Sequence, residues 1–159
     1  MAPEPIDYQI VRNLQTALQA IAVGSGYHYT VAATAVKLDP NQNVEALIAP
    51  DGPRPFIVLE LTPETWAYYP ASQVRVVMSL TIHWVSESIP TTDESRLQTY
   101  LRGCADVERA MAIDVTRGGL AVDTRIVKRA FDTAIDGAQV WAMVDVALSL
   151  HRTFGAPDA

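Results

Sequence analysis

Two segments of the chain place apolar residues three or four positions apart, the spacing that gathers side chains on one face of a helix. The first runs from Asp7 to Ala22, and its apolar positions are Ile10, Leu14, Leu18 and Ile21. The second follows Thr91 and ends near Asp114, and its apolar positions are Leu97, Leu101, Cys104, Val107 and Met111. Thr91 and Glu94 have the spacing of a capping box. The polar residues that we expect on the outer face of this second helix are Arg96, Arg102, Asp106 and Glu108.

Five segments have the residue pattern of β-strands. The clearest is Gln73 to Val85, where apolar residues occupy every second position, and Gln139 to His151 alternates in the same way. Phe56 to Leu61 is a largely apolar run after a proline-rich turn, which is typical of a buried strand. Tyr27 to Leu38 is rich in β-branched and aromatic residues, and Arg125 to Phe131 precedes a turn and an alternating partner, so both are predicted strands.

The order of these elements predicts an α+β fold. The strands are joined by turns rather than by helical crossovers, which favours a mostly antiparallel sheet with two main helices packed on one face. A chain of 159 residues is the usual size of one domain. We therefore expect residues 1–159 to form a single domain with short flexible ends.

An aromatic segment between two prolines is the most suggestive feature of the surface. Trp66, Tyr68 and Tyr69 lie between Pro63 and Pro70, and prolines are disfavoured in central strands, so we expect a loop here. Aromatic residues are frequent anchors of protein interfaces. The segment is therefore a candidate interface, and the alternative is that the loop folds back to close the edge of the core.

A basic group in an otherwise acidic chain is the second candidate interface. It consists of Arg117, Arg125, Lys128 and Arg129. Such a group can pair with an acidic surface on a neighbouring copy, and the alternative is that its side chains are simply solvated.

Composition narrows the possible partners and compartments. The net charge of −6 argues against a general DNA- or RNA-binding protein, because phosphate binding requires clustered basic residues. Charged residues make up 19% and hydrophobic residues 49% of the chain, as in a folded domain. One cysteine excludes an intramolecular disulfide and favours a cytosolic setting. We expect neither a signal peptide nor a membrane span.

No pattern in the chain indicates catalysis, a cofactor or a metal. The three histidines, His28, His83 and His151, fall on predicted strands without a recognised ligand spacing, and His83 is expected to be solvated. Cys104 lies on an apolar helix face, where a buried thiol is unreactive. Gly24, Ser25 and Gly26 follow a helix rather than open one, so they predict a turn and not a phosphate-binding loop. We expect no enzymatic activity.

The whole arrangement resembles the tail terminator, or tail completion, proteins of long-tailed bacteriophages. The resemblance covers nearly the full chain and rests on the order of its elements. These are the helix Ile10 to Ile21, the proline-led strand Arg54 to Leu59, the long strand Val74 to Val85, the second helix, the Gly118–Gly119 turn and the final strand pair. Phage neck and head–tail joining proteins are similar in size and texture.

The resemblance implies a structural subunit of the virion, made in the cytoplasm of the bacterial host. Copies would form a ring, typically a hexamer, that caps the tail tube, stops its polymerisation and joins it to a neck or head–tail connector protein. DNA would pass through the lumen without specific binding. Other phage connector subunits, a small oligomeric enzyme with a pocket between subunits, and a monomeric adaptor that binds a peptide along a sheet edge remain as alternatives.

Overall fold

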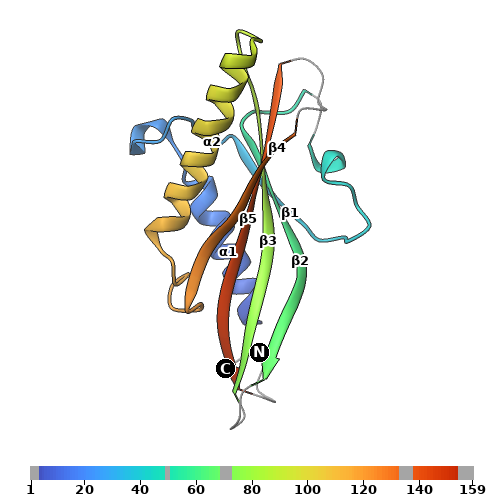
Figure 1. Ribbon diagram of the computed structural model, residues 1–159, viewed down its shortest axis with the longest axis vertical. Helices are drawn as coiled ribbons and strands as arrows, with labels where there is room; N and C mark the ends of the chain where they lie inside the picture. Colours follow the sequence, from blue (N-terminus) through green and yellow to red (C-terminus); the bar gives the residue numbers. More distant parts are fainter. Residues whose placement is uncertain (1–3, 49–50, 69–72, 133–137, 154–159) are drawn as a thin grey trace.

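The computed structural model describes residues 4–48, 51–68, 73–132 and 138–153. Within these residues, five strands form one sheet in the order β1-β2-β3-β5-β4 (Figure 1). The strands are β1 (Ala33–Lys37), β2 (Phe56–Tyr68), β3 (Gln73–Glu87), β4 (Asp123–Asp132) and β5 (Gln139–Thr153). The helices are α1 (Ile6–Gln19), α2 (Asp93–Ile113) and the short 3-10 helices η1 (Val23–Ser25) and η2 (Val44–Leu47).

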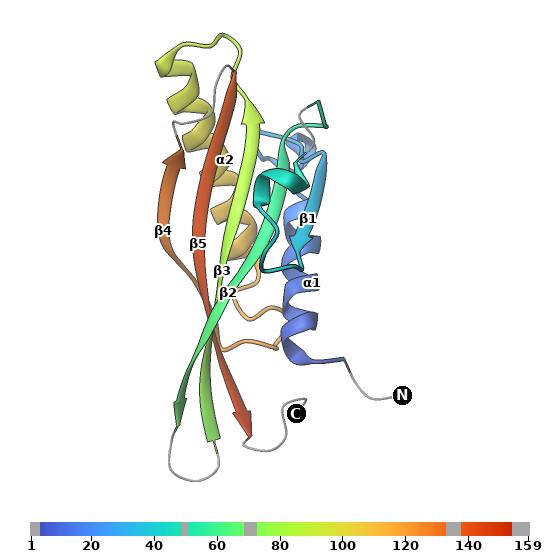
Figure 2. The same cartoon turned by 90° about the vertical axis from the view of Figure 1, so that its right-hand side faces the viewer.

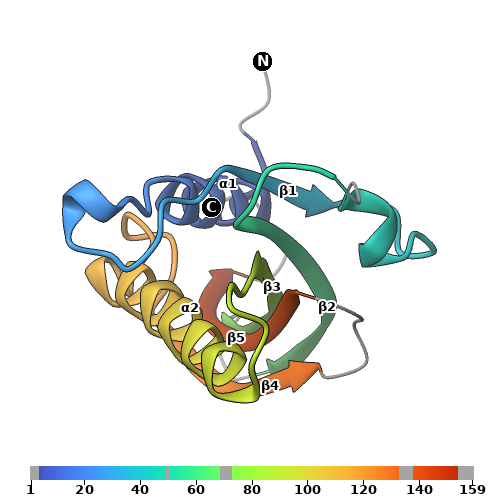
Figure 3. The same cartoon turned by 90° about the horizontal axis from the view of Figure 1, so that it is seen from above.

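The α+β class and the mostly antiparallel sheet are confirmed. β2 pairs with β3, β3 with β5 and β5 with β4 in antiparallel register, whereas β1 pairs with β2 in parallel. Seen from above, α1 and α2 lie side by side against the same face of the sheet (Figure 3). Neither end of the sheet has a further strand beside it in the described chain, so β1 and β4 are edge strands.

The alternating patterns of β3 and β5 build the core between the sheet and the helices. Their helix-facing side chains are all at most 2% exposed, and they are Val74, Val76, Met78, Leu80, Ile82, Trp84, Val140, Ala142, Val144, Val146, Leu148 and Leu150. α1 adds Ile10, Leu14 and Leu18, which are fully buried as its spacing predicts. On the opposite face of the sheet, η2 covers one end, where Val44 and Ile48 pack with Trp141.

The prediction that Tyr27 to Leu38 forms one strand is wrong for its first half, because only Ala33–Lys37 joins the sheet. The carboxylate of Asp106 on α2 accepts the backbone N–H groups of His28, at 3.0 Å, and Tyr29, at 2.9 Å. These bonds hold the segment against α2, so His28 lies in a loop and not on a strand. Asp106 is 2% exposed, so its predicted place on the outer helix face is also wrong.

The buried face of α2 differs from the predicted apolar stripe. Leu97 and Leu101 are about half exposed, at 55% and 48%, whereas Cys104, Val107 and Met111 are buried as expected. The helix is therefore rotated about its axis relative to the prediction. Gly103 explains this rotation, because it packs so closely on Trp84 that an added Cβ would lie 2.7 Å from the indole ring. The helix also begins one residue later than predicted. Its N-cap is Thr92, which forms a capping box with Ser95 rather than pairing Thr91 with Glu94.

The predicted aromatic loop is also wrong, because residues 63–68 continue β2 as a strand. Two features accommodate Pro63 there. The register of β2 against β3 shifts between Thr62 and Thr65, and β1 pairs only with Phe56 to Glu60, so this half of β2 has no strand on its other side. Bulges and edges are the places where a sheet tolerates proline. Tyr69 and Pro70 lie outside the described residues.

We predict that Gly103→Ala lowers the free energy of unfolding by about 1 kcal/mol. Alanine in a helix interior stabilises the folded protein by roughly 1 kcal/mol relative to glycine. Overpacking the close contact with Trp84 destabilises it by about 1–3 kcal/mol. Denaturant titration measures the difference. Gly24→Ala is the matched control, because a Cβ there meets nothing within 4 Å, and its effect should stay within about 0.5 kcal/mol. A stabilised Gly103→Ala variant would contradict the proposed packing of α2.

Candidate interface surfaces

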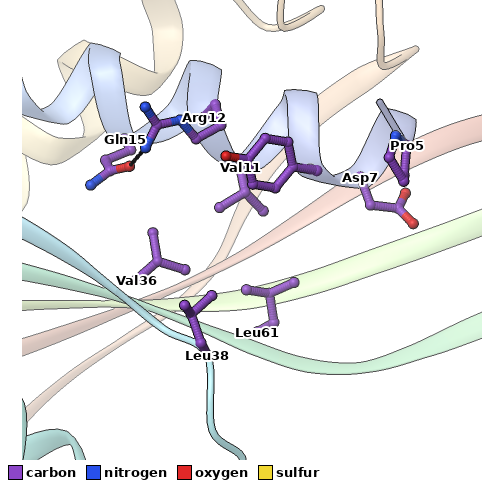
Figure 4. Close-up of a pocket in the computed structure, with 9 residues that line it drawn as sticks. Pro5, Asp7, Val11, Arg12, Gln15, Val36, Leu38 and Leu61 are labelled. Carbon is purple, nitrogen blue, oxygen red and sulfur yellow. Dashed lines mark hydrogen bonds between the residues drawn. The ribbon is translucent and has the colours of Figure 1, made fainter. Parts of the chain in front are cut away.

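A groove lies between the start of α1, the end of β1 and the middle of β2 (Figure 4). Its volume is about 480 Å³, and it is lined by Pro5, Asp7, Tyr8, Val11, Arg12, Gln15, Val36, Leu38 and Leu61. The side chains of Val11 from α1, of Leu61 from β2 and of Leu38, just after β1, point into the same space (Figure 4). Leu38 is 85% exposed and Leu61 42%, so the floor of this α1–β1 groove is apolar and open to solvent.

The unequal lengths of β1 and β2 create this groove. The last paired residues of the two strands are Lys37 and Glu60, so Leu61 is the first β2 residue without a β1 neighbour. The first turns of α1 lie over this gap and supply Tyr8 and Val11. Sequence reasoning missed the site, because its parts come from three segments that only the fold brings together. The one local signal was Leu38, an apolar residue directly before Asp39 and Pro40.

Three of the four predicted basic residues, Arg125, Lys128 and Arg129, lie exposed on edge strand β4. Arg125 forms an ion pair with Asp123, and Arg129 forms one with Glu108 of α2.

The fourth member of the predicted basic group, Arg117, is fully buried and does not belong to this surface. Its Nη2 donates to the carbonyl oxygen of Met111 near the end of α2, and its Nε donates to Thr124 Oγ1 at 3.3 Å. Burial lowers the pKa of Arg117, although the nearby Asp114 opposes the shift. Arg117 therefore ties the end of α2 to the start of β4.

Apolar residues are exposed on the same edge, one of them at a bulge. The register of β4 against β5 shifts between Ile126 and Lys128, which leaves Val127 unpaired and 67% exposed. Val122 and Phe131 on either side are 56% and 38% exposed. We call Val122, Val127 and Phe131, together with Arg125, Lys128 and Arg129, the β4 edge. It combines apolar and basic side chains.

The strands β2, β3 and β5 extend beyond the helices at one end of the molecule (Figures 1 and 2). Two predicted interface residues lie in this extension, because Trp66 pairs with Val76 and Tyr68 with Val74 in the β2–β3 ladder. The third, Tyr69, lies outside the described residues.

A further apolar surface lies on the outside of α2. Leu97 and Leu101, four residues apart and therefore on one side of the helix, line a shallow groove of about 390 Å³ with His28.

A buried polar network occupies the sheet face opposite the helices. His83 is 6% exposed, so the prediction of a solvated histidine is wrong. Trp141 Nε1 donates to His83 Nδ1 at 3.1 Å, and therefore the other nitrogen, Nε2, carries the proton and donates to Glu60 at 2.9 Å. Lys37 forms an ion pair with the same carboxylate. Both ring nitrogens are thus used within the protein.

The pKa values of this network follow from its burial. Burial lowers the pKa of His83 below 6.5, and the hydrogen bond to Glu60 offsets only part of the effect. Burial opposes ionisation of Glu60, but the hydrogen bonds from Lys37 and His83 outweigh it and lower the pKa of that carboxyl below 4.5. The network is therefore built around a neutral imidazole and an ionised carboxylate.

The described residues contain no group of three or more histidine, cysteine or acidic side chains placed to hold a metal ion. Burial raises the pKa of Cys104, which keeps this core thiol protonated. Of the helices that the structure describes, none combines the length and hydropathy of a membrane-spanning segment. Neither the known protein families nor the curated proteins compared with this sequence include one that matches it.

We predict that the stability of the protein falls as the pH drops below 6.5. The unfolded chain then binds a proton on His83 that the folded protein, with its lowered pKa, does not bind. His83→Gln is the matched variant, because its amide can accept from Trp141 and donate to Glu60 without titrating. Denaturant titrations between pH 5 and pH 8, a range chosen to bracket the ordinary histidine pKa of about 6.5, should show a shallower pH dependence for this variant. Equal slopes for the two proteins would contradict the neutral imidazole.

Proposed function

We propose that this protein is a structural virion subunit of the tail terminator type. Copies assemble into a closed ring, a hexamer by resemblance, that caps a phage tail tube, stops its polymerisation and joins it to the neck or head. The observation that carries this proposal is the presence of two different exposed apolar surfaces at opposite edges of one sheet. These are the α1–β1 groove and the β4 edge.

Two different surfaces on opposite edges suit a ring better than a symmetric dimer. A closed ring is built from heterologous contacts, in which one patch of each subunit meets another patch of the next. β1 and α1 lie on one side of the molecule and β4 on the other (Figure 2). Side chains such as Leu38 and Val127, at 85% and 67% exposed, are large apolar residues that a neighbouring subunit would cover.

The remaining surfaces would serve the other partners of such a ring. The extension of β2, β3 and β5 carries Trp66 and Tyr68, and we assign it to the tail tube protein because aromatic residues anchor interfaces. The outer side of α2, with Leu97 and Leu101, is assigned to the neck or head–tail connector protein. The net charge of −6 suits a lumen through which DNA moves without adhering.

Tube assembly in the presence of the protein tests this function. Tail tube subunits encoded together with this chain would be polymerised with and without it and imaged by electron microscopy. We expect short tubes that carry an added ring at one end. A neck or connector subunit would bind finished tails but leave tube growth unchanged, and this outcome would reassign the protein. Unaltered tubes without bound protein would refute both functions.

Alanine substitutions in the extension test the proposed tube contact in the same assay. We expect Trp66→Ala combined with Tyr68→Ala to weaken capping by at least tenfold, because a single aromatic anchor contributes about 2 kcal/mol. Ile89→Ala is the control, since Ile89 is 83% exposed and lies outside the assigned surfaces. Unchanged capping by the double variant would remove the extension from the proposed tube contact.

A further inference from the structure

We infer that the α1–β1 groove receives the β4 edge of a second copy of this chain, with Val127 seated over Leu38 and Leu61. This inference rests on the proposed ring and identifies the two surfaces that join its subunits. Three observations support it, and they concern the shape of the groove, the shape of the β4 edge and the charges around both.

The groove has the form of a receptor for apolar side chains. Its volume of about 480 Å³ falls in the range of binding pockets, roughly 300–1,000 Å³. Apolar side chains from α1, β1 and β2 converge on it (Figure 4). Its most exposed member, Leu38, lies just beyond the end of β1, where neither strand nor helix covers it in the described chain. Burial of apolar surface such as this stabilises a contact by about 25 cal/mol for each Å² removed from water.

The β4 edge has the complementary form. The bulge between Ile126 and Lys128 makes Val127 project from an edge strand. Bulges and flanking charges normally keep an edge strand from pairing with other chains along its length. A partner would therefore bind this edge through its exposed side chains and their charges, and not by adding a strand to the sheet.

Exposed residues of opposite charge lie at the two surfaces, Lys128 on the β4 edge and Asp39 next to Leu38 of the groove. Arg125, Lys128 and Arg129 lie within two positions of Val127 in the sequence. Arg125 and Arg129 have acidic partners within the subunit, whereas Lys128 has no ion pair among the described residues. Asp7 lines the groove, and the exposed residues Glu4 and Asp39 are next in sequence to its lining residues Pro5 and Leu38. Of the basic residues at the groove, Lys37 forms an ion pair with Glu60, and Arg12, which belongs to the lining, donates to the uncharged amide of Gln15.

This arrangement of charge matters because the whole chain is acidic. Copies with a net charge of −6 repel one another unless contact brings the basic minority against acidic side chains. On the β4 edge, exposed basic and apolar residues occur together. The groove has an apolar floor, and the acidic Asp39 follows its lining residue Leu38. The β4 edge of a second copy therefore offers an apolar side chain for the floor and Lys128 for Asp39.

Disulfide trapping tests the pairing. The native thiol, Cys104, is buried, so Leu38→Cys and Val127→Cys each introduce one accessible thiol at an exposed position. We expect the double variant to form a ladder of disulfide-linked multimers on mild oxidation in non-reducing electrophoresis. A mixture of the two single variants should give dimers, whereas each single variant alone should give none. Ile89→Cys mixed with Leu38→Cys is the matched control and should also give none.

The outcomes of this experiment distinguish a wrong pairing of surfaces from a wrong function. Dimers from either single variant alone would indicate a symmetric contact and would overturn the pairing. A wild-type ring without cross-linking of the double variant would reject these two surfaces but leave the proposed ring intact. A protein that neither cross-links nor assembles would overturn both.

Charge exchange provides a second readout that does not depend on oxidation. We expect Lys128→Glu to weaken self-association by about tenfold, and Asp39→Lys in the same chain to restore it, because the exchange recreates an opposite-charge pair across the contact. Self-association would be measured by sedimentation at low salt. Equal losses in the single and double variants would overturn the charge pairing.

Discussion

The contact between Gly103 and the indole of Trp84 determines how α2 lies on the sheet, and much of the structure depends on it. A residue with a Cβ could not approach the ring so closely, so the glycine face of the helix turns inward. Asp106 turns inward with it and binds the backbone of His28 and Tyr29. The backbone of these two residues therefore does not join the sheet, and β1 is limited to Ala33–Lys37. The same rotation leaves Leu97 and Leu101 facing solvent.

The short β1 and the long β2 explain why the molecule presents apolar surface at its margins. β2 continues beyond its pairing with β1, so no strand lies beside Leu61 on that side. Leu61 and the neighbouring Leu38 instead face α1 across an open groove. At the other margin, the bulge in β4 exposes Val127 among basic residues. A subunit with a well-packed interior and such unlike margins is suited to head-to-tail assembly. By contrast, the buried side chains of His83 and Asp106 have partners within the subunit, Glu60 and His28.

The sequence predicts an element well when its buried residues recur at regular spacing. It does not predict features that depend on one contact between residues far apart in the chain. α1, β3 and β5 matched because one face of each is buried along its length. The prediction of an aromatic loop was wrong because proline is disfavoured only in central strands, and β2 is no longer flanked by β1 at Pro63. His83 and Arg117 were expected at the surface, since local sequence does not indicate that Trp141 or the end of α2 would bury them. The groove was missed because it unites residues from α1, β1 and β2.

The mass and shape of the assembled protein test the proposed ring most directly. Light scattering would give the solution mass of the purified chain, and negative-stain images of the same sample would give its outline. We expect closed rings with an open centre, of about six subunits by resemblance to tail terminator proteins. A monomer at every concentration, both alone and after mixing with tail tubes, would contradict the proposed ring.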